Sequence, residues 1–376
     1  MREFKIFLVV ACFTALTYWG VEPYAHSVMK PHVAPANFDF EQEDINFAKK
    51  ILAEKEKALE LAKAENNETN VESANKALEL AKENLAKQEA LWASVAKIDF
   101  NSGNASEGKA FFETNCVACH GAKFDGIEGA ITDSSLGVLP PDLSSAGLIY
   151  DEKFLAALIM NPALALKVDH KFGDAFLMTP YNAEVSGENE DVANANIANV
   201  IAYLKEIGIK YQEDFENKTK ALLDEKYAKL TELDEGTKKV LWQKDFEFAK
   251  DKNNFIEACG RCHDMKYDSF TAVSAKNDLK AYLGSNPPDL SMMIRSRGDE
   301  YLHNFINNTQ KLLVGTAMPR VGITEEAQAS VVAYLEKVGD SKKEERESLG
   351  LYIMGFFVIL SIFAIAWKRK IWSKLH

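Results

Sequence analysis

Cys116-Val117-Ala118-Cys119-His120 and Cys259-Gly260-Arg261-Cys262-His263 are two copies of one pattern, Cys-x-x-Cys-His, which begin 143 residues apart and hold four of the five cysteines. This spacing is typical of c-type haem attachment, in which both thiols form thioethers and the adjacent histidine binds the iron. The alternatives are a thioredoxin-like redox pair and a four-cysteine zinc site, but the zinc site leaves both histidines without a role. The sequence therefore predicts two covalently bound haem c groups. Their attachment residues are Cys116, Cys119, Cys259 and Cys262, with His120 and His263 as iron ligands.

A methionine downstream of each motif is the expected second iron ligand. Met318 lies in Gly315-Thr-Ala-Met-Pro319, ahead of a helix expected over 325–338, and the proline fixes the loop that carries the thioether. Met178 lies in the matching place, in Leu177-Met-Thr-Pro180, ahead of a helix expected over 192–207. A haem closed by methionine has a raised potential and is suited to electron transfer.

Three other side chains compete for these ligand positions. Met160 ends an apolar run, 154–160, where methionine is more often a core residue. His170 stands between Asp169 and Lys171, which suits a solvated turn. In the second half of the chain, His303 lies in a segment expected to be helical. Met178 and Met318 remain the preferred ligands.

Other elements of the sequence also occur twice. Pro140-Pro-Asp-Leu-Ser144 recurs as Pro287-Pro-Asp-Leu-Ser291, and Val200-Ile-Ala-Tyr-Leu204 matches Val331-Val-Ala-Tyr-Leu335. Each proline pair predicts an extended loop, and the Asp-Leu-Ser that follows can cap a helix. The common order of haem motif, proline pair, methionine and closing helix indicates an internal duplication. Each repeat is small for a core of its own, so a covalently held haem would supply much of the apolar interior.

These motifs resemble class I cytochrome c domains over residues 100–210 and 245–340. The resemblance implies an all-α fold, in which two tandem domains each cross their terminal helices beside a haem crevice. It also implies axial ligation by His120 with Met178 and by His263 with Met318. The first domain departs from the family pattern, because Met178-Thr179-Pro180 replaces the usual Met-Pro pair.

Both ends of the chain are apolar. The 19 residues from Leu349 to Trp367 carry no charge and precede a basic tail, which predicts a C-terminal transmembrane helix with its end on the cytoplasmic side. Residues 1–24 predict an N-terminal membrane segment. It is either a retained helix or a signal peptide cleaved near Ala25-His26-Ser27. Both interpretations export the middle of the chain.

Two further segments are rich in charge and in helix-forming residues. Residues 41–98 predict a helical hairpin arm, because apolar positions recur at helical spacing and Asn66-Asn-Glu-Thr-Asn70 interrupts them. The arm can dock a partner, support the haem domains or be a solvated spacer. The surroundings of Asn67 also resemble a bacterial glycosylation sequon, although a polar turn explains them as well. Residues 211–244 predict a helical connector between the two haem domains.

The net charge of −12 argues against nucleic acid as a partner. The C-terminal anchor and two exported haem domains resemble the dihaem cytochrome c1-type subunit of bacterial quinol–cytochrome c reductase, in the form found in epsilonproteobacteria. This resemblance implies a place in the bacterial inner membrane, with haem domains in the periplasm. It implies cytochrome b and a Rieske iron–sulfur protein as partners, and a soluble cytochrome c or terminal oxidase as electron acceptor. It also implies that this chain only transfers electrons, while quinone chemistry belongs to cytochrome b.

Two alternatives stay open. The dihaem subunit of a cbb3-type oxidase also has two haem domains, but its membrane anchor is N-terminal, unlike the segment 349–367 here. A dihaem cytochrome c peroxidase needs one haem whose iron can open a coordination position, which a methionine ligand in both domains disfavours. Ligation by His170 in place of Met178 would favour the peroxidase.

Overall fold

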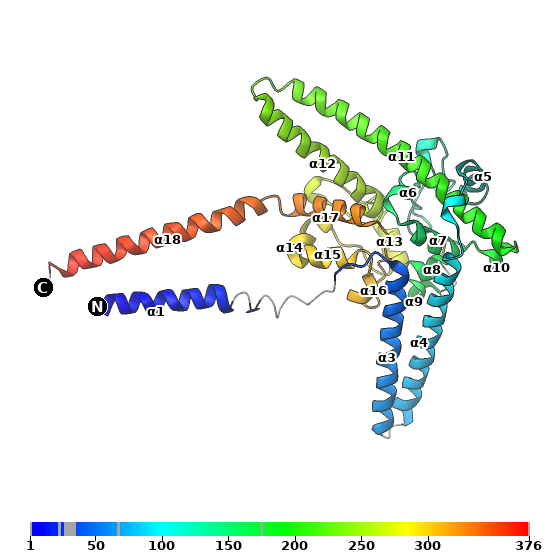
Figure 1. The fold of residues 1–376 in the computed structure, drawn as a ribbon, viewed down its shortest axis with the longest axis horizontal. Coiled ribbons are helices and arrows are strands. Elements are labelled where there is room, and N and C mark those ends of the chain that lie inside the picture. The colour runs from blue at the N-terminus through cyan, green and yellow to red at the C-terminus, as the bar shows by residue number, and fades with distance from the viewer. Residues whose placement is uncertain (1, 22–23, 26–34, 66–67, 174–175, 375–376) are drawn as a thin grey trace. The chain divides into compact units, whose positions relative to one another are not determined.

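The fold is helical throughout the part of the chain that can be described. The computed structural model describes residues 2–21, 24–25, 35–65, 68–173 and 176–374. Within these ranges there is no β-strand, only three isolated antiparallel bridges (Figure 1). The predicted all-α fold is therefore confirmed. The chain divides into two compact units, residues 1–37 and 38–376.

Both predicted membrane segments are helical. In the first unit, α1 (Arg2–Leu16) continues into a π-helical turn, η1 (Thr17–Val21). In the second unit, α18 (Lys343–Trp372) contains the apolar stretch predicted over 349–367. By length and composition, Arg2–Val21 and Ser348–Trp372 could each cross a membrane. Of the proposed cleavage site, His26 and Ser27 lie outside the described residues.

The predicted arm is a pair of long helices, α3 (Phe40–Ala64) and α4 (Glu68–Val95), which pack along each other (Figure 1). Asp39 caps α3 by accepting a hydrogen bond from the backbone N–H of Gln42 at 3.0 Å. Asn66 and Asn67, in the interruption between the helices, lie outside the described residues. The base of the arm joins the core of the domain that carries the first Cys-x-x-Cys-His motif, where Trp92 is 1% exposed.

In this first domain, α5 (Ala105–Asn115) crosses α11 (Glu190–Ala228) at Gly108. A Cβ atom on Gly108 would lie 1.9 Å from the carbonyl oxygen of Asn199, so only glycine permits this close approach. Five short helices lie between the two along the chain: α6 (Ala146–Ile149), α7 (Glu152–Met160), α8 (Pro162–Ala165), α9 (Asp169–Phe172) and α10 (Ala183–Ser186).

The second domain, which carries the second motif, repeats this plan. Here α12 (Glu235–Cys259) packs against α17 (Glu325–Gly339), and the rings of Phe255 and Tyr334 lie 4.8 Å apart between them. The intervening elements are α13 (Lys276–Leu283), the 3₁₀ turn η6 (Leu290–Met292), α14 (Met293–Arg297), α15 (Asp299–Phe305) and α16 (Thr309–Leu312).

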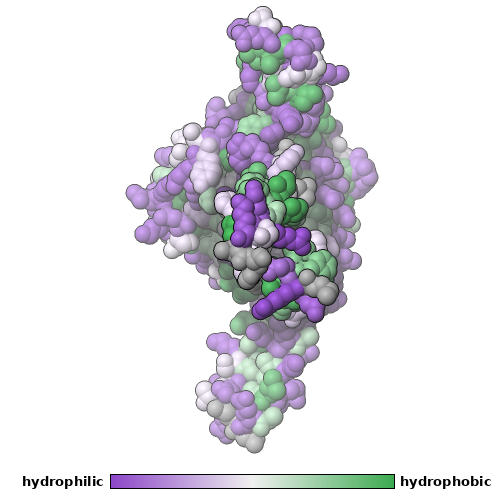
Figure 2. Space-filling model, turned by 90° about the vertical axis from the view of Figure 1, so that its left-hand side faces the viewer, coloured by the Kyte–Doolittle hydropathy of each residue, from purple (hydrophilic) through white to green (hydrophobic). Residues whose placement is uncertain are grey.

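The connector is an extension of the domain helices rather than a separate insert. The closing helix predicted over 192–207 continues to Ala228, because the stretch after Gly208 contains no glycine or proline that would end it. After a turn, α12 begins at Glu235 and runs back to the second motif. Tyr227 and Phe246 form a small apolar cluster where the two helices meet. The surfaces of both long hairpins are mainly hydrophilic, with scattered apolar side chains (Figure 2).

The two domains dock through their backbones. Tyr150 and Ile323 form an antiparallel bridge, flanked by hydrogen bonds from Asp151 N to Gly322 O at 3.1 Å and from Thr324 N to Ile149 O at 2.9 Å. Ile149 lies in the core of the second domain although it belongs to the first. Directional backbone bonds therefore join the two domains in addition to the helical connector.

Candidate functional site

The first Cys-x-x-Cys-His motif forms one further turn after α5. Cys116 is the C-terminal cap of that helix, and the backbone N–H of His120 donates to the carbonyl oxygen of Cys116 at 2.8 Å. This turn brings both thiols and the imidazole to one short segment. Burial raises the pKa of the Cys116 thiol to about 11, so the free thiol is neutral at pH 7.

The imidazole of His120 is oriented by the repeated proline loop. Its Nδ1 atom lies 3.0 Å from the carbonyl oxygen of Pro141. Burial lowers the pKa of His120, which favours the neutral ring. Because a carbonyl can only accept, the neutral ring carries its proton on Nδ1 and leaves Nε2 free to bind a metal.

The second motif has the same geometry. Cys259 ends α12, and the backbone N–H of His263 donates to the carbonyl oxygen of Cys259 at 3.1 Å. The Nδ1 atom of His263 lies 2.8 Å from the carbonyl oxygen of Pro288, the counterpart of Pro141. Burial lowers the pKa of His263 and raises that of the Cys259 thiol to about 12.

The Asp-Leu-Ser that follows each proline pair ties the two loops of the site together. Asp142 Oδ2 accepts from the backbone N–H of Lys123 at 2.9 Å, and Asp289 Oδ1 accepts from that of Lys266 at 3.3 Å. The prediction that this sequence caps a helix holds only in the second copy, where Asp289 caps η6. It is wrong for Asp142, because α6 begins four residues later at Ala146. Sequence reasoning found the repeat but missed that its proline carbonyls orient the histidines.

The closing helices make a matching pair of contacts with the motif loops. Tyr203 Oη donates to Asp125 at 2.9 Å, and Tyr334 Oη donates to Asp268 at 2.6 Å. A lysine pairs with each of these carboxylates at 2.7 Å, Lys109 with Asp125 and Lys252 with Asp268. The duplication predicted from sequence therefore extends to individual side-chain bonds.

The residues of both motifs suit covalently attached haem. All four motif cysteines are free thiols, and the Nδ1 contact of each neighbouring histidine leaves its Nε2 available to bind a metal. A four-cysteine zinc site would need both pairs at one point. Among the described residues, no three or more His, Cys, Asp or Glu side chains gather as a metal site.

The proposed methionine ligands both lie in non-helical loops. Met178 and Met318 are half-buried, and Met318 N donates to Thr316 Oγ1 at 3.2 Å. Of their rivals, Met160 is only 5% exposed and packs in the core of the first domain, as expected for a core residue. His170 is exposed in α9, and His303 is half-buried in the predicted helical segment, now α15.

Comparison with known proteins identifies the first domain. Residues 105–208 match the family model of cytochrome c, so the chain contains a cytochrome c domain, the class of protein that carries covalently bound haem. No curated protein matches the chain. A chain in a solved structure titled "Hyperthermophilic respiratory Complex III" has 23% sequence identity, with coverage of 35% of this chain and 77% of that chain. Its TM-score is 0.29, and a likeness this distant carries no argument about fold or function.

Proposed function

We propose that this chain is a membrane-anchored, dihaem c-type electron-transfer subunit of a quinol–cytochrome c reductase. The observation that supports two haems is the repeated bond from the histidine Nδ1 to a proline carbonyl, 3.0 Å in one domain and 2.8 Å in the other. A second copy of this orienting contact is expected if residues 245–340 bind haem as residues 100–210 do.

In this role Cys116 with Cys119 and Cys259 with Cys262 would each hold one haem by two thioethers. His120 with Met178 and His263 with Met318 would be the iron ligands. When bound, each haem supplies one-electron iron chemistry, which methionine ligation directs toward electron transfer. The chain orients the imidazoles and joins the two domains by backbone hydrogen bonds.

The reductase assignment draws on the order of segments in the chain. Two haem domains followed by an apolar helix with a basic end suit a subunit of the bacterial inner membrane with its haems in the periplasm. The chain then takes electrons from the Rieske protein and passes them to a soluble cytochrome c or terminal oxidase. Cytochrome b, the other partner, carries out the quinone chemistry.

Affinity purification of the full-length chain from native membranes in mild detergent tests this proposal. Co-purification of cytochrome b and a Rieske protein, with quinol-dependent reduction of both haems, is the expected result. Recovery of oxidase subunits without these two proteins would instead support a role in a cbb3-type oxidase. Turnover of hydrogen peroxide by the purified chain would indicate a peroxidase.

A further inference from the structure

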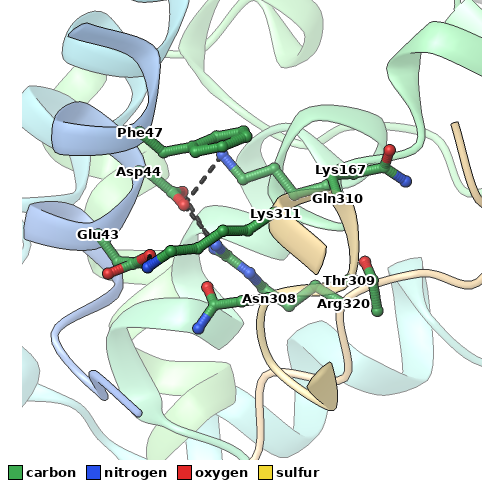
Figure 3. A pocket seen from close by; sticks show the side chains of 9 residues that line it. All are labelled: Glu43, Asp44, Phe47, Lys167, Asn308, Thr309, Gln310, Lys311 and Arg320. Carbon is green, nitrogen blue, oxygen red and sulfur yellow. Dashed lines mark hydrogen bonds and ion pairs between the residues drawn. The ribbon is translucent and has the colours of Figure 1, made fainter. Parts of the chain in front are cut away.

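The arm and both domains meet at a buried carboxylate. Asp44, near the start of α3, has a side chain that is 1% exposed, and the Arg320 side chain beside it is 3% exposed. Lys167 of the first domain lies 2.9 Å from the same carboxylate, and Trp92 of the arm donates to it at 3.1 Å. Figure 3 shows the side chains of Lys167 and Arg320 both reaching Asp44 on α3. One acidic side chain therefore links three parts of the chain.

Arg320 is held on every side. Its Nη1 and Nη2 atoms both donate to the Asp44 carboxylate, the first at 3.0 Å, as a two-pronged pair. Its Nε donates to the carbonyl oxygen of Asn307 at 2.9 Å. The ring of Phe40 lies 5.2 Å from its guanidinium carbon. Loss of Asp44 would leave a buried cation without its counter-charge, so the arginine could not keep this place.

Arg320 lies two residues after the proposed second-haem ligand, in the same loop between α16 and α17. Met318, Pro319 and Arg320 are consecutive, and Pro319 removes much of the freedom between the other two. The backbone N–H of Arg320 donates to the carbonyl oxygen of Leu166 at 2.9 Å. On the N-terminal side of Met318, Gln310 Nε2 donates to the carbonyl oxygen of Thr316 at 2.7 Å. The loop is thus fixed on both sides of Met318, and Asp44 secures one of them.

We propose that the helical arm acts as a clamp on the second haem: Asp44 holds Arg320, and Arg320 keeps Met318 on the iron. Asp44 and Arg320 are positioning residues, because their side chains bond to Lys167, Trp92, Asn307 and each other and not to the proposed haem ligands. This inference rests on the proposed function, since it requires haem bound between His263 and Met318. The arm thus has a role in ligation of the second haem, although it packs into the core of the first domain.

The test is Asp44→Asn in the full-length holoprotein, with optical redox titration and carbon monoxide as a probe of open iron. The asparagine side chain has nearly the shape of aspartate but carries no charge. The expected result is loss of about half of the methionine–iron(III) absorption band, because only one of two haems loses its methionine. Carbon monoxide then binds one ferrous haem per chain, and the potential of that haem falls while the other stays unchanged.

Glu43→Gln is the matched control. Glu43 is the neighbour of Asp44 on α3, and its ion-pair partner is Lys311 of the second domain, at 2.7 Å, whereas Asp44 pairs with Arg320. This variant is expected to keep both methionine–iron bonds. If Glu43→Gln and Asp44→Asn have equal effects, general loosening of the arm explains them and the clamp is wrong.

Two other outcomes also overturn the proposal. One is an Asp44→Asn protein with the wild-type band and potentials. The other is equal loss of methionine ligation at both haems, which would indicate a purely structural role in the first domain. Should Asp44→Asn fail to accumulate, Arg320→Lys decides the question, because lysine keeps the charge but cannot bridge both carboxylate oxygens. A wild-type band in Arg320→Lys would then reject the clamp.

Failure of the ligand assignment can be told apart from failure of the clamp. Met318→Ala removes the proposed ligand itself and must abolish about half of the band. If Met318→Ala leaves the band intact, the proposed function is wrong about this ligand. If Met318→Ala abolishes it and Asp44→Asn does not, only the clamp is wrong.

Discussion

The guanidinium of Arg261 donates a hydrogen bond of 3.3 Å to the carbonyl oxygen of Leu139, so the second haem motif touches the loop that orients the first motif's histidine. Arg261 lies between Cys259 and Cys262, and Leu139 immediately precedes the proline pair whose second carbonyl accepts from His120. The same loop is bonded to the second domain through Leu139 N and Ser274 Oγ, at 3.1 Å. One arginine cation is therefore shared between the two proposed haem sites.

This position predicts that Arg261→Gln lowers the reduction potentials of both haems. A nearby cation disfavours the oxidised, more positive iron, so its removal shifts each potential downward by on the order of tens of millivolts. Arg261→Lys keeps the charge and is expected to stay near wild type. Redox titration measures both haems, with Arg295→Gln, an exposed arginine in α14, as the control. A shift at the second haem alone would contradict a shared effect.

The two motifs predict two haems per chain. The double substitution Cys259→Ser and Cys262→Ser is expected to leave one haem, and Cys116→Ser with Cys119→Ser likewise leaves one, because serine forms no thioether. The pyridine haemochrome spectrum of the denatured protein measures the number of haems per chain. Cys12→Ser is the control, since Cys12 is exposed in α1 and outside both motifs. Two haems retained in either double variant would refute covalent attachment at that motif.

Two substitutions distinguish Met178 from Met160 as the proposed iron ligand of the first domain. Met178→Leu is expected to remove about half of the methionine–iron(III) band, whereas Met160→Leu should keep it. Met160 lies in the apolar core, where exchange of methionine for leucine conserves volume and costs less than about 1.5 kcal/mol. The reverse result, with the band lost in Met160→Leu, would transfer the ligand role to Met160. Loss of the band in neither variant would point to His170.

Local patterns made part of this fold predictable. The arm can be predicted because Asn66–Asn70 interrupts an otherwise continuous helical pattern. The closing helix over 325–338 can be predicted from the spacing of its apolar residues. The end of the first closing helix was misplaced, since the domain boundary suggested by the repeat is not a helix boundary in the chain. A helix ends where its capping and helix-breaking residues are effective, but α11 continues through Gly208 and then meets no glycine or proline up to Ala228.

Contacts between residues far apart in the chain could not be predicted from the sequence, for a different reason. Asp44 and Arg320 are 276 residues apart, and each is one charge among many in a chain with 44 basic and 56 acidic residues. Nothing local marks them as buried partners. The contact from each histidine to a proline carbonyl was also missed, because a backbone acceptor leaves no mark on side-chain chemistry. Its only signal was the repeat of Pro-Pro-Asp-Leu-Ser itself.

The helix crossing in the first domain predicts a selective loss of stability. Gly108→Ala would place a Cβ atom 1.9 Å from the Asn199 carbonyl oxygen, and a backbone atom cannot move aside as a flexible side chain can. The cost is expected to be about 3 kcal/mol, at the upper end for an overpacked core. Thermal unfolding followed at the methionine–iron band should show one haem lost at a lower temperature than the other.

Gly350→Ala is the control for that substitution, because a Cβ atom there meets nothing within 4 Å. It is expected to leave the thermal transition of both haem domains unchanged. The second domain offers an internal comparison: at the position in its helix crossing that corresponds to Gly108, Asp251 accepts a hydrogen bond from Ser330, so side chains are accommodated at this point. Gly108→Ala should therefore lower the unfolding temperature of the first domain only. Unchanged unfolding in Gly108→Ala would mean that α5 and α11 do not cross as closely as described.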